Sequence, residues 1–203
     1  MILIGQYDSP FVRRVGIALT LYGMPFEHRP WSVFGDAEKI RPYNPLLRVP
    51  TLVLDDGAVL IESHSILDHL DRLAGPERAL FPQDEPARRH ALKAAALATG
   101  VAEKAVALFY ELHLHAQTSP VWVERCRTQV ADALAALEAD GRAWAGPAIG
   151  HAGIAVAVAL RFVTEAHPGL VDMTRLPRLA AHAASMEALP AFRAIVQPFH
   201  PPA

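Results

Sequence analysis

Cysteine is nearly absent from this chain. Among 203 residues there is one, Cys126, so no intrachain disulfide can form. Its neighbours are charged residues of a stretch expected to be helical, which favours a small structural thiol over a redox motif. A chain with so few cysteines is typical of a reducing compartment, and we expect a cytoplasmic protein.

Long apolar runs and blocks of like charge are also missing. The longest apolar run, residues 152–160, is too short to span a membrane, and the N-terminus lacks the basic region of a secretory signal. The formal net charge is -2 and basic residues form no block, so nucleic acid is not an expected partner. The ten histidines are scattered; even His113 and His115 would face different sides of a helix, so no metal site is expected.

The first half of the chain alternates strand and helix signals. Ser9-Pro10 predicts a helix start, with serine as N-cap and proline in the first turn, and Gly23 predicts its end. Strands are expected over residues 2–6, 25–31, 49–54 and 59–61. Further helical segments are expected over residues 36–40 and from Ser63, as a cap, to Gly75. The order β-α-β-α-β-β-α predicts a mixed sheet with helices.

The second half carries helix signals only. Helices are expected over residues 86–117 (one helix or a pair kinked at Gly100), 121–139, 154–166, 179–186 and 190–195. The segment 154–166 is almost entirely apolar, which predicts a central helix surrounded by others. We therefore divide the chain into an α/β domain over 1–75, a linker over 76–85 and an all-helical domain over 86–203.

Three short segments of the first half form a joint signal, although each is weak alone. They are residues 9–15, which begin with Ser9-Pro10-Phe11-Val12 after a strand; residues 44–52, in which Arg48-Val49-Pro50 leads into the strand expected over 49–54; and Glu62-Ser63 at a helix start. In this order the chain resembles the glutathione transferase family, and the first segment is similar to that of its serine-type classes, such as the tau and theta classes. The resemblance implies a thioredoxin-like domain followed by an all-helical domain, and a homodimer.

The same resemblance implies a role for each matching residue. Ser9 would hydrogen-bond the glutathione sulfur, and Val49, before a cis Pro50, would pair its backbone with the cysteinyl unit. Glu62 and Ser63 would hold the γ-glutamyl end, and Arg48 would lie near the glycyl end. The implied activity is conjugation of glutathione, as co-substrate and without a metal, to a small hydrophobic electrophile in detoxification.

Simpler interpretations of these residues stay open at this point. Ser9 and Ser63 could be helix caps only, and Glu62 could be a solvated charge. Pro50 could be trans at a sheet edge. Arg13 and Arg14 are expected to be solvated charges on a helix face.

The electrophile pocket is predicted from family position, between the first domain and the long helix. Its candidates are the side chains of Tyr7, Phe11, Phe34, Phe109, Tyr110 and His113. Each could instead belong to a hydrophobic core, as aromatic residues at helical spacing commonly do. Other uses of the fold also stay open, namely a glutathione-binding module without turnover and a glutathione-dependent isomerase or peroxidase.

The central helix departs from the family pattern at its start. The family usually has a Ser/Thr-x-x-Asp capping box there, whereas this chain has Gly150-His151-Ala152-Gly153. Gly150 is expected at the N-cap. Replacing Gly153 by aspartate is expected to complete the box and stabilise the protein.

Overall fold

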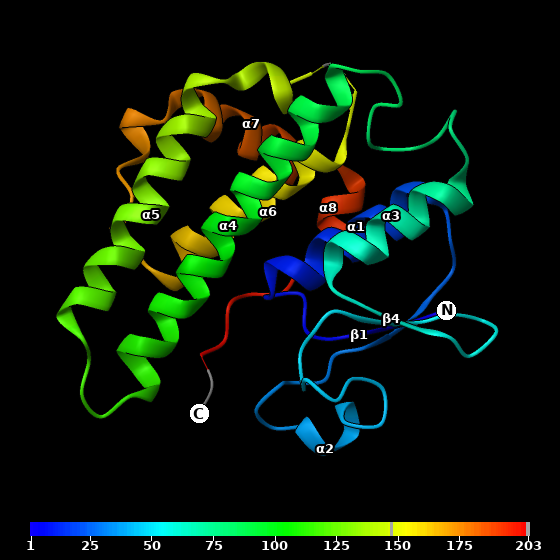
Figure 1. Ribbon diagram of the computed structural model, residues 1–203, viewed down its shortest axis with the longest axis horizontal. Helices are drawn as coiled ribbons and strands as arrows, with labels where there is room; N and C mark the ends of the chain where they lie inside the picture. Colours follow the sequence, from blue (N-terminus) through cyan, green and yellow to red (C-terminus); the bar gives the residue numbers. More distant parts are fainter. Residues whose placement is uncertain (147, 202–203) are drawn as a thin grey trace. The chain divides into compact units, whose positions relative to one another are not determined.

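The computed structural model describes residues 1–146 and 148–201, which divide into two compact units (Figure 1). Unit 1 contains Met1–Leu80 together with the segment from Leu189 onward, and unit 2 contains Phe81–Ala188. The sequence-based division assigned everything after residue 85 to the helical domain. The structure differs for the segment from Leu189, which packs with unit 1.

Unit 1 has the predicted order of elements, β-α-β-α-β-β-α, with a last short helix returning from the C-terminal segment. Its elements are β1 (Ile2–Ile4), α1 (Pro10–Tyr22), β2 (Glu27–Arg29), α2 (Ala37–Ile40), β3 (Thr51–Val53), β4 (Val59–Ile61), α3 (Ser63–Ala74) and α8 (Pro190–Ala194). The strand order is β2-β1-β3-β4, with β1 and β2 parallel and the other pairs antiparallel. This mixed sheet confirms the predicted α/β, thioredoxin-like class for the first half.

Side chains of the sheet enter two different apolar clusters, because successive residues of a strand point to opposite faces. Leu3 and Leu52 pack with the apolar sides of α1 and α3. Ile4 and Val53 pack on the other face with Ile40 of α2. The sheet therefore lies between α1 and α3 on one side and α2 on the other, as Figure 1 shows.

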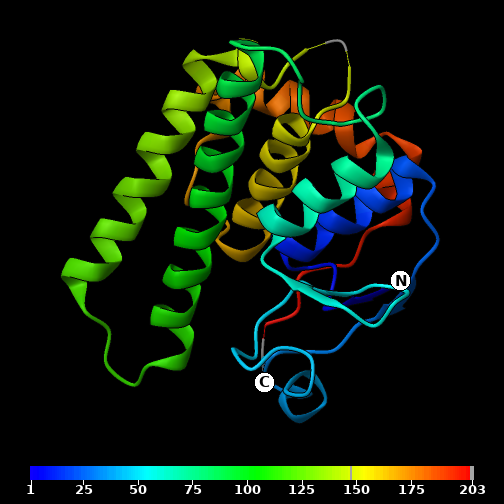
Figure 2. The ribbon, with the colours of Figure 1, turned by 45° about the vertical axis from the view of Figure 1, so that its right-hand side comes forward.

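Unit 2 contains only helices. They are α4 (Ala87–Leu114), α5 (Pro120–Ala139), the 3-10 turn η1 (Gly141–Ala143), α6 (His151–Ala166), the 3-10 turn η2 (Met173–Arg175) and α7 (Pro177–Glu187). α4 runs as a single helix through Gly100, and α5 lies beside it (Figure 2). α6 packs against α4 and α7 and is buried along nearly its whole length, as its apolar sequence predicted. None of the helices described between residues 1 and 201 combines the length and apolar character that a membrane crossing requires.

The start of α6 confirms one expectation and corrects another. Gly150 is the N-cap, as predicted. Gly153, however, is buried, and a Cβ there would lie 2.9 Å from the backbone oxygen of Trp144 and 3.1 Å from Cε1 of His182. The expected stabilisation by aspartate is therefore wrong, because Gly153 is required by close packing.

Candidate active site

The three segments that carry the family resemblance lie at one end of the sheet of unit 1. In the strand register, Ile4 at the end of β1 pairs with Thr51 at the start of β3, which in turn pairs with Ile61 at the end of β4. The residues that follow β1, precede β3 and follow β4 must therefore lie at the same end of the sheet. The loop that leads to Ser9 follows β1, the segment Arg48–Pro50 precedes β3, and the pair Glu62-Ser63 follows β4.

Ser9 is the N-cap of α1, with Pro10 in the first turn. Its Oγ accepts the N–H of Val12 at 3.4 Å, and its own N–H donates to the carbonyl of Gln6 at 3.2 Å. Capping uses the hydroxyl oxygen as an acceptor and leaves the O–H available as a donor. The cap interpretation and a role in ligand binding are thus compatible, and the helix end beside Ser9 is electropositive.

Gly5 allows the loop after β1 to approach its neighbours closely. Its φ is +127°, and a Cβ would lie 2.6 Å from Cγ2 of Val12 and 2.7 Å from Cβ of Val49. Both the backbone angle and the space require glycine here. The result is that Val49 packs against the loop that carries Ser9.

The Val49–Pro50 peptide bond is cis, as the resemblance implied. The segment before it is held by Asn44, whose buried amide Nδ2 donates to the carbonyl of Arg48 at 2.8 Å and to Oγ1 of Thr51 at 3.2 Å. The sequence predicted no role for Asn44, although it begins the second segment. The turn signal of its Asn-Pro pair was the available indication.

Glu62, not Ser63, occupies the N-cap position of α3, so the prediction that Ser63 is the cap is wrong. Ser63 is the first helical residue and is 1% exposed. Glu62 has φ +69° and ψ 122°, an unusual conformation for a residue other than glycine, and its side chain forms no capping hydrogen bond. Such strain is concentrated at functional sites of proteins.

Glu62 also meets the second segment directly. Its Oε1 lies 3.4 Å from Nη1 of Arg48, and the two side chains are 53% and 61% exposed. An ion pair this exposed adds little stability. Its position leaves both charges accessible to a ligand at this end of the sheet.

Arg13 and Arg14 are buried, at 3% and 1% exposure, so the prediction that they are solvated is wrong. Arg13 donates from Nε to the carbonyl of Ile195 at 2.8 Å and from Nη2 to that of Phe192 at 3.2 Å, both in the returning C-terminal segment. Arg14 contacts the first residue of α3, with Nη1 3.4 Å from Oγ of Ser63. Burial lowers the Arg14 pKa to about 10 against the opposing effect of the Glu62 charge, so the guanidinium stays cationic at neutral pH.

Three of the predicted pocket residues belong to unit 1. Tyr7 stacks on His28 with ring centres 3.8 Å apart, its N–H donates to Oε1 of Gln197, and burial raises its pKa to about 12. Phe11 is half-buried on α1, and Phe34 is 49% exposed.

The other three predicted pocket residues lie on α4 of unit 2. Phe109 is buried and stacks on His113 at 4.1 Å, and Nδ1 of His113 donates to the Phe109 carbonyl at 2.9 Å. Tyr110 is half-buried and His113 is exposed. Phe109 thus contributes to the core of unit 2, the simpler interpretation that the sequence left open.

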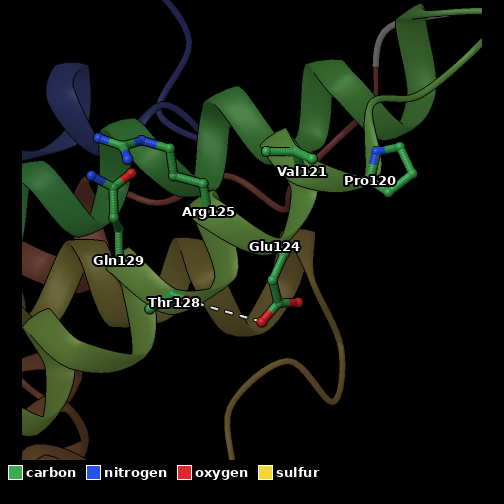
Figure 3. Close-up of a pocket in the computed structure, with 6 residues that line it drawn as sticks. All are labelled: Pro120, Val121, Glu124, Arg125, Thr128 and Gln129. Atoms are coloured by element: carbon green, nitrogen blue, oxygen red, sulfur yellow. Dashed lines mark hydrogen bonds between the residues drawn. The ribbon is translucent and has the colours of Figure 1, made fainter.

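A surface hollow of about 610 Å³ lies along α5 (Figure 3). It is lined by Pro120, Val121, Glu124, Arg125, Thr128 and Gln129. Inside it, Oγ1 of Thr128 donates to Oε1 of Glu124 at 3.5 Å. None of the predicted pocket residues lines this hollow, so it does not locate the electrophile site.

Comparison with known proteins identifies the family of both halves of the chain. Residues 3–78 match the glutathione S-transferase N-terminal domain, and residues 120–185 match the glutathione S-transferase C-terminal domain. The curated relatives include several transferases of Arabidopsis thaliana, and the chain spans about half the length of those it matches first. The maleylacetoacetate isomerase of Pseudomonas aeruginosa is 36% identical over 94 residues, 44% of this chain and 43% of that protein.

Solved structures match over the full chain. A glutathione S-transferase of Methylobacterium radiotolerans, in complex with glutathione sulfonate, has a TM-score of 0.91 and 29% identity, covering 100% of this chain and 97% of the other. A glutathione transferase family member of Pseudomonas fluorescens, with bound glutathione, has a TM-score of 0.88 and 33% identity, covering 98% and 99%. The two domain matches and these structures show that this chain belongs to the glutathione transferase family.

Proposed function

We propose that this protein binds glutathione at the end of the unit 1 sheet, stabilises its thiolate with Ser9 and adds it to a small hydrophobic electrophile. The observation that carries the proposal is the convergence of the three motif segments on one end of the sheet. The glutathione complexes of the similar structures support the same ligand.

Each part of the tripeptide has a matching group. The cis bond to Pro50 leaves the backbone groups of Val49 available for hydrogen bonds. They pair with the backbone of the cysteinyl unit, as in the addition of a strand to a sheet edge. Ser63 and the N-terminus of α3 bind the carboxylate of the γ-glutamyl unit, and Glu62 binds the ammonium group of the same unit. Arg48 lies near the glycyl end.

The chemistry requires a lowered thiol pKa. A thiol of pKa about 8.5 is only about 3% thiolate at pH 7, and lowering the pKa to about 6.5 makes most of it thiolate. That shift corresponds to about 2.7 kcal/mol of preference for the charged form. The Ser9 O–H, placed at the electropositive start of α1, supplies part of it by donating to the sulfur.

The electrophile pocket and the assembly complete the proposal. Tyr7, Phe11, Phe34, Tyr110 and His113 are its proposed lining residues. We propose that the protein is cytoplasmic and forms a homodimer. Light scattering of the purified protein tests the dimer, which should have about twice the mass of one 22.1 kDa chain.

A second candidate is favoured by the similarity to maleylacetoacetate isomerase. An isomerase would use the same thiolate as a catalyst and return it, so glutathione would not be consumed. Following both the substrate and free glutathione in one reaction separates the two activities. Retention on immobilised glutathione with neither activity would instead favour a binding module without turnover.

Replacing Ser63 by alanine should weaken glutathione binding about 5- to 150-fold, because the γ-glutamyl carboxylate loses a buried donor worth about 1–3 kcal/mol. Isothermal titration calorimetry of glutathione measures the change. Ser65→Ala is the matched control, since Ser65 starts the same helix but is exposed. Equal affinity of Ser63→Ala and wild type would remove Ser63 from the site.

A further inference from the structure

We propose that Arg14 is a positioning residue that makes Ser63 selective for a carboxylate. Arg14 donates to Oγ of Ser63 from the protein interior, so the Ser63 O–H is directed outward, toward the ligand. The inference rests on the proposed glutathione site, and it adds a residue that never touches the ligand.

The buried guanidinium of Arg14 donates a hydrogen bond to Ser63. Nη1 lies 3.4 Å from Oγ of Ser63, whereas Nε and Nη2 are buried and have no hydrogen-bond partner within the described part of the chain. Glu62 is the carboxylate whose charge acts on the guanidinium, and it does so without a direct contact among those described. The neighbouring Arg13 differs, because two backbone carbonyls accept from it.

The hydrogen-bonding capacities of the two groups explain the selectivity. A serine hydroxyl has one O–H and two lone pairs, and a guanidinium can only donate. When Arg14 fills a lone pair of the Ser63 oxygen, the most favourable remaining partner for Ser63 is an acceptor. The N-terminus of α3 and the buried cation both favour an anion at the same place. A carboxylate meets all of these conditions, whereas an ammonium or amide N–H could use only the remaining lone pair and gains nothing from the positive surroundings.

Stability and binding should respond differently to the loss of Arg14. A buried cation without a paired carboxylate stabilises a fold poorly, and replacing such a group by an apolar side chain of similar volume is often neutral or stabilising. Arg14→Met should therefore keep or raise the melting temperature. If the residue is a positioning group, the same variant should nevertheless bind glutathione less tightly.

The test compares two ligands by calorimetry, glutathione and γ-aminobutyryl-cysteinyl-glycine, which lacks only the γ-glutamyl carboxylate. Wild type should prefer glutathione by about tenfold or more. Arg14→Met should lose most of this preference, with binding of the analogue unchanged, and Arg14→Lys should keep part of it. In a Ser63→Ala background Arg14→Met should change the preference no further, because Arg14 acts through Ser63.

Arg13→Met is the control for removing a buried arginine from the same helix. It should lower the melting temperature, since two backbone carbonyls lose their donor, and keep the preference for glutathione. An Arg14→Met protein with wild-type preference would overturn the inference, as would equal losses for both ligands. If Arg14→Met does not fold, the role is structural unless folded Arg14→Lys shows a reduced preference. Failure of the wild-type protein to bind glutathione would instead refute the proposed function itself.

Discussion

Replacing Ser9 by alanine should slow glutathione addition about 3- to 25-fold near pH 7, through loss of the thiolate, while leaving glutathione affinity within a few-fold. A hydrogen bond to a charged group contributes about 1.5–3 kcal/mol, so its loss should raise the pKa of the bound thiol by about 1–2 units. Thiolate absorbance of the bound glutathione, followed against pH, measures this change. Above the raised pKa both enzymes hold the thiolate, so the difference in rate should shrink as the pH rises.

Ser119→Ala is the matched control for the loss of a helix cap. Ser119 caps α5 as Ser9 caps α1, with proline next and an N–H three residues on donating to Oγ at 3.4 Å. Each alanine variant should lose about 1 kcal/mol of stability, and only Ser9→Ala should lose activity. A Ser9→Ala enzyme with wild-type rate and thiol pKa would reduce Ser9 to a cap.

Replacing Gly153 by aspartate should destabilise the protein by about 3–5 kcal/mol, because the new carboxylate would be buried and unpaired. The Cβ alone would come within 2.9 Å of the Trp144 carbonyl oxygen. Burial lowers the pKa of His182, so this neighbouring ring supplies no compensating positive charge at neutral pH. Its Nε2–H already donates to the Gly153 carbonyl at 2.9 Å. Urea or thermal denaturation measures the loss.

Two alanine variants separate packing from helix propensity. Gly153→Ala adds only the Cβ and should cost about 1–3 kcal/mol. Gly100→Ala adds the same group within α4, where nothing lies within 4 Å, and should stabilise by up to about 1 kcal/mol. A Gly153→Ala protein as stable as wild type would mean that the α6 start relaxes at little cost.

Local signals in the sequence predicted much of unit 1. Ser9-Pro10 specified the start of α1, and short apolar runs indicated β1, β3 and β4. A tight turn, indicated in the sequence by Asp56-Gly57, predicted the hairpin of β3 and β4. These features depend on neighbours a few residues apart, which a sequence displays directly. The cis state of Pro50 came from the family resemblance, since spacing alone does not distinguish it from trans.

The wrong predictions concern residues whose environment is set by parts of the chain far away in sequence. Arg14 was expected in solvent, but its partner Ser63 is 49 residues away in sequence. Arg13 is held by carbonyls about 180 residues further on. Ser63 was taken for a cap because serine favours that position, whereas the left-handed φ of Glu62 moves the helix start by one residue. Gly153 was expected to tolerate aspartate, but Trp144 and His182 pack closely against it.

The return of the C-terminal segment to unit 1 has a consequence for biosynthesis. The acceptors of Arg13 are in Phe192 and Ile195, and the acceptor of the Tyr7 N–H is in Gln197. A ribosome completes all of Phe81–Ala188 before it makes these residues. The contacts of Arg13 and of the Tyr7 N–H with this segment therefore form only after the whole helical unit has been synthesised. The loop that carries Ser9 thus cannot complete its native contacts while the helical unit is still being made.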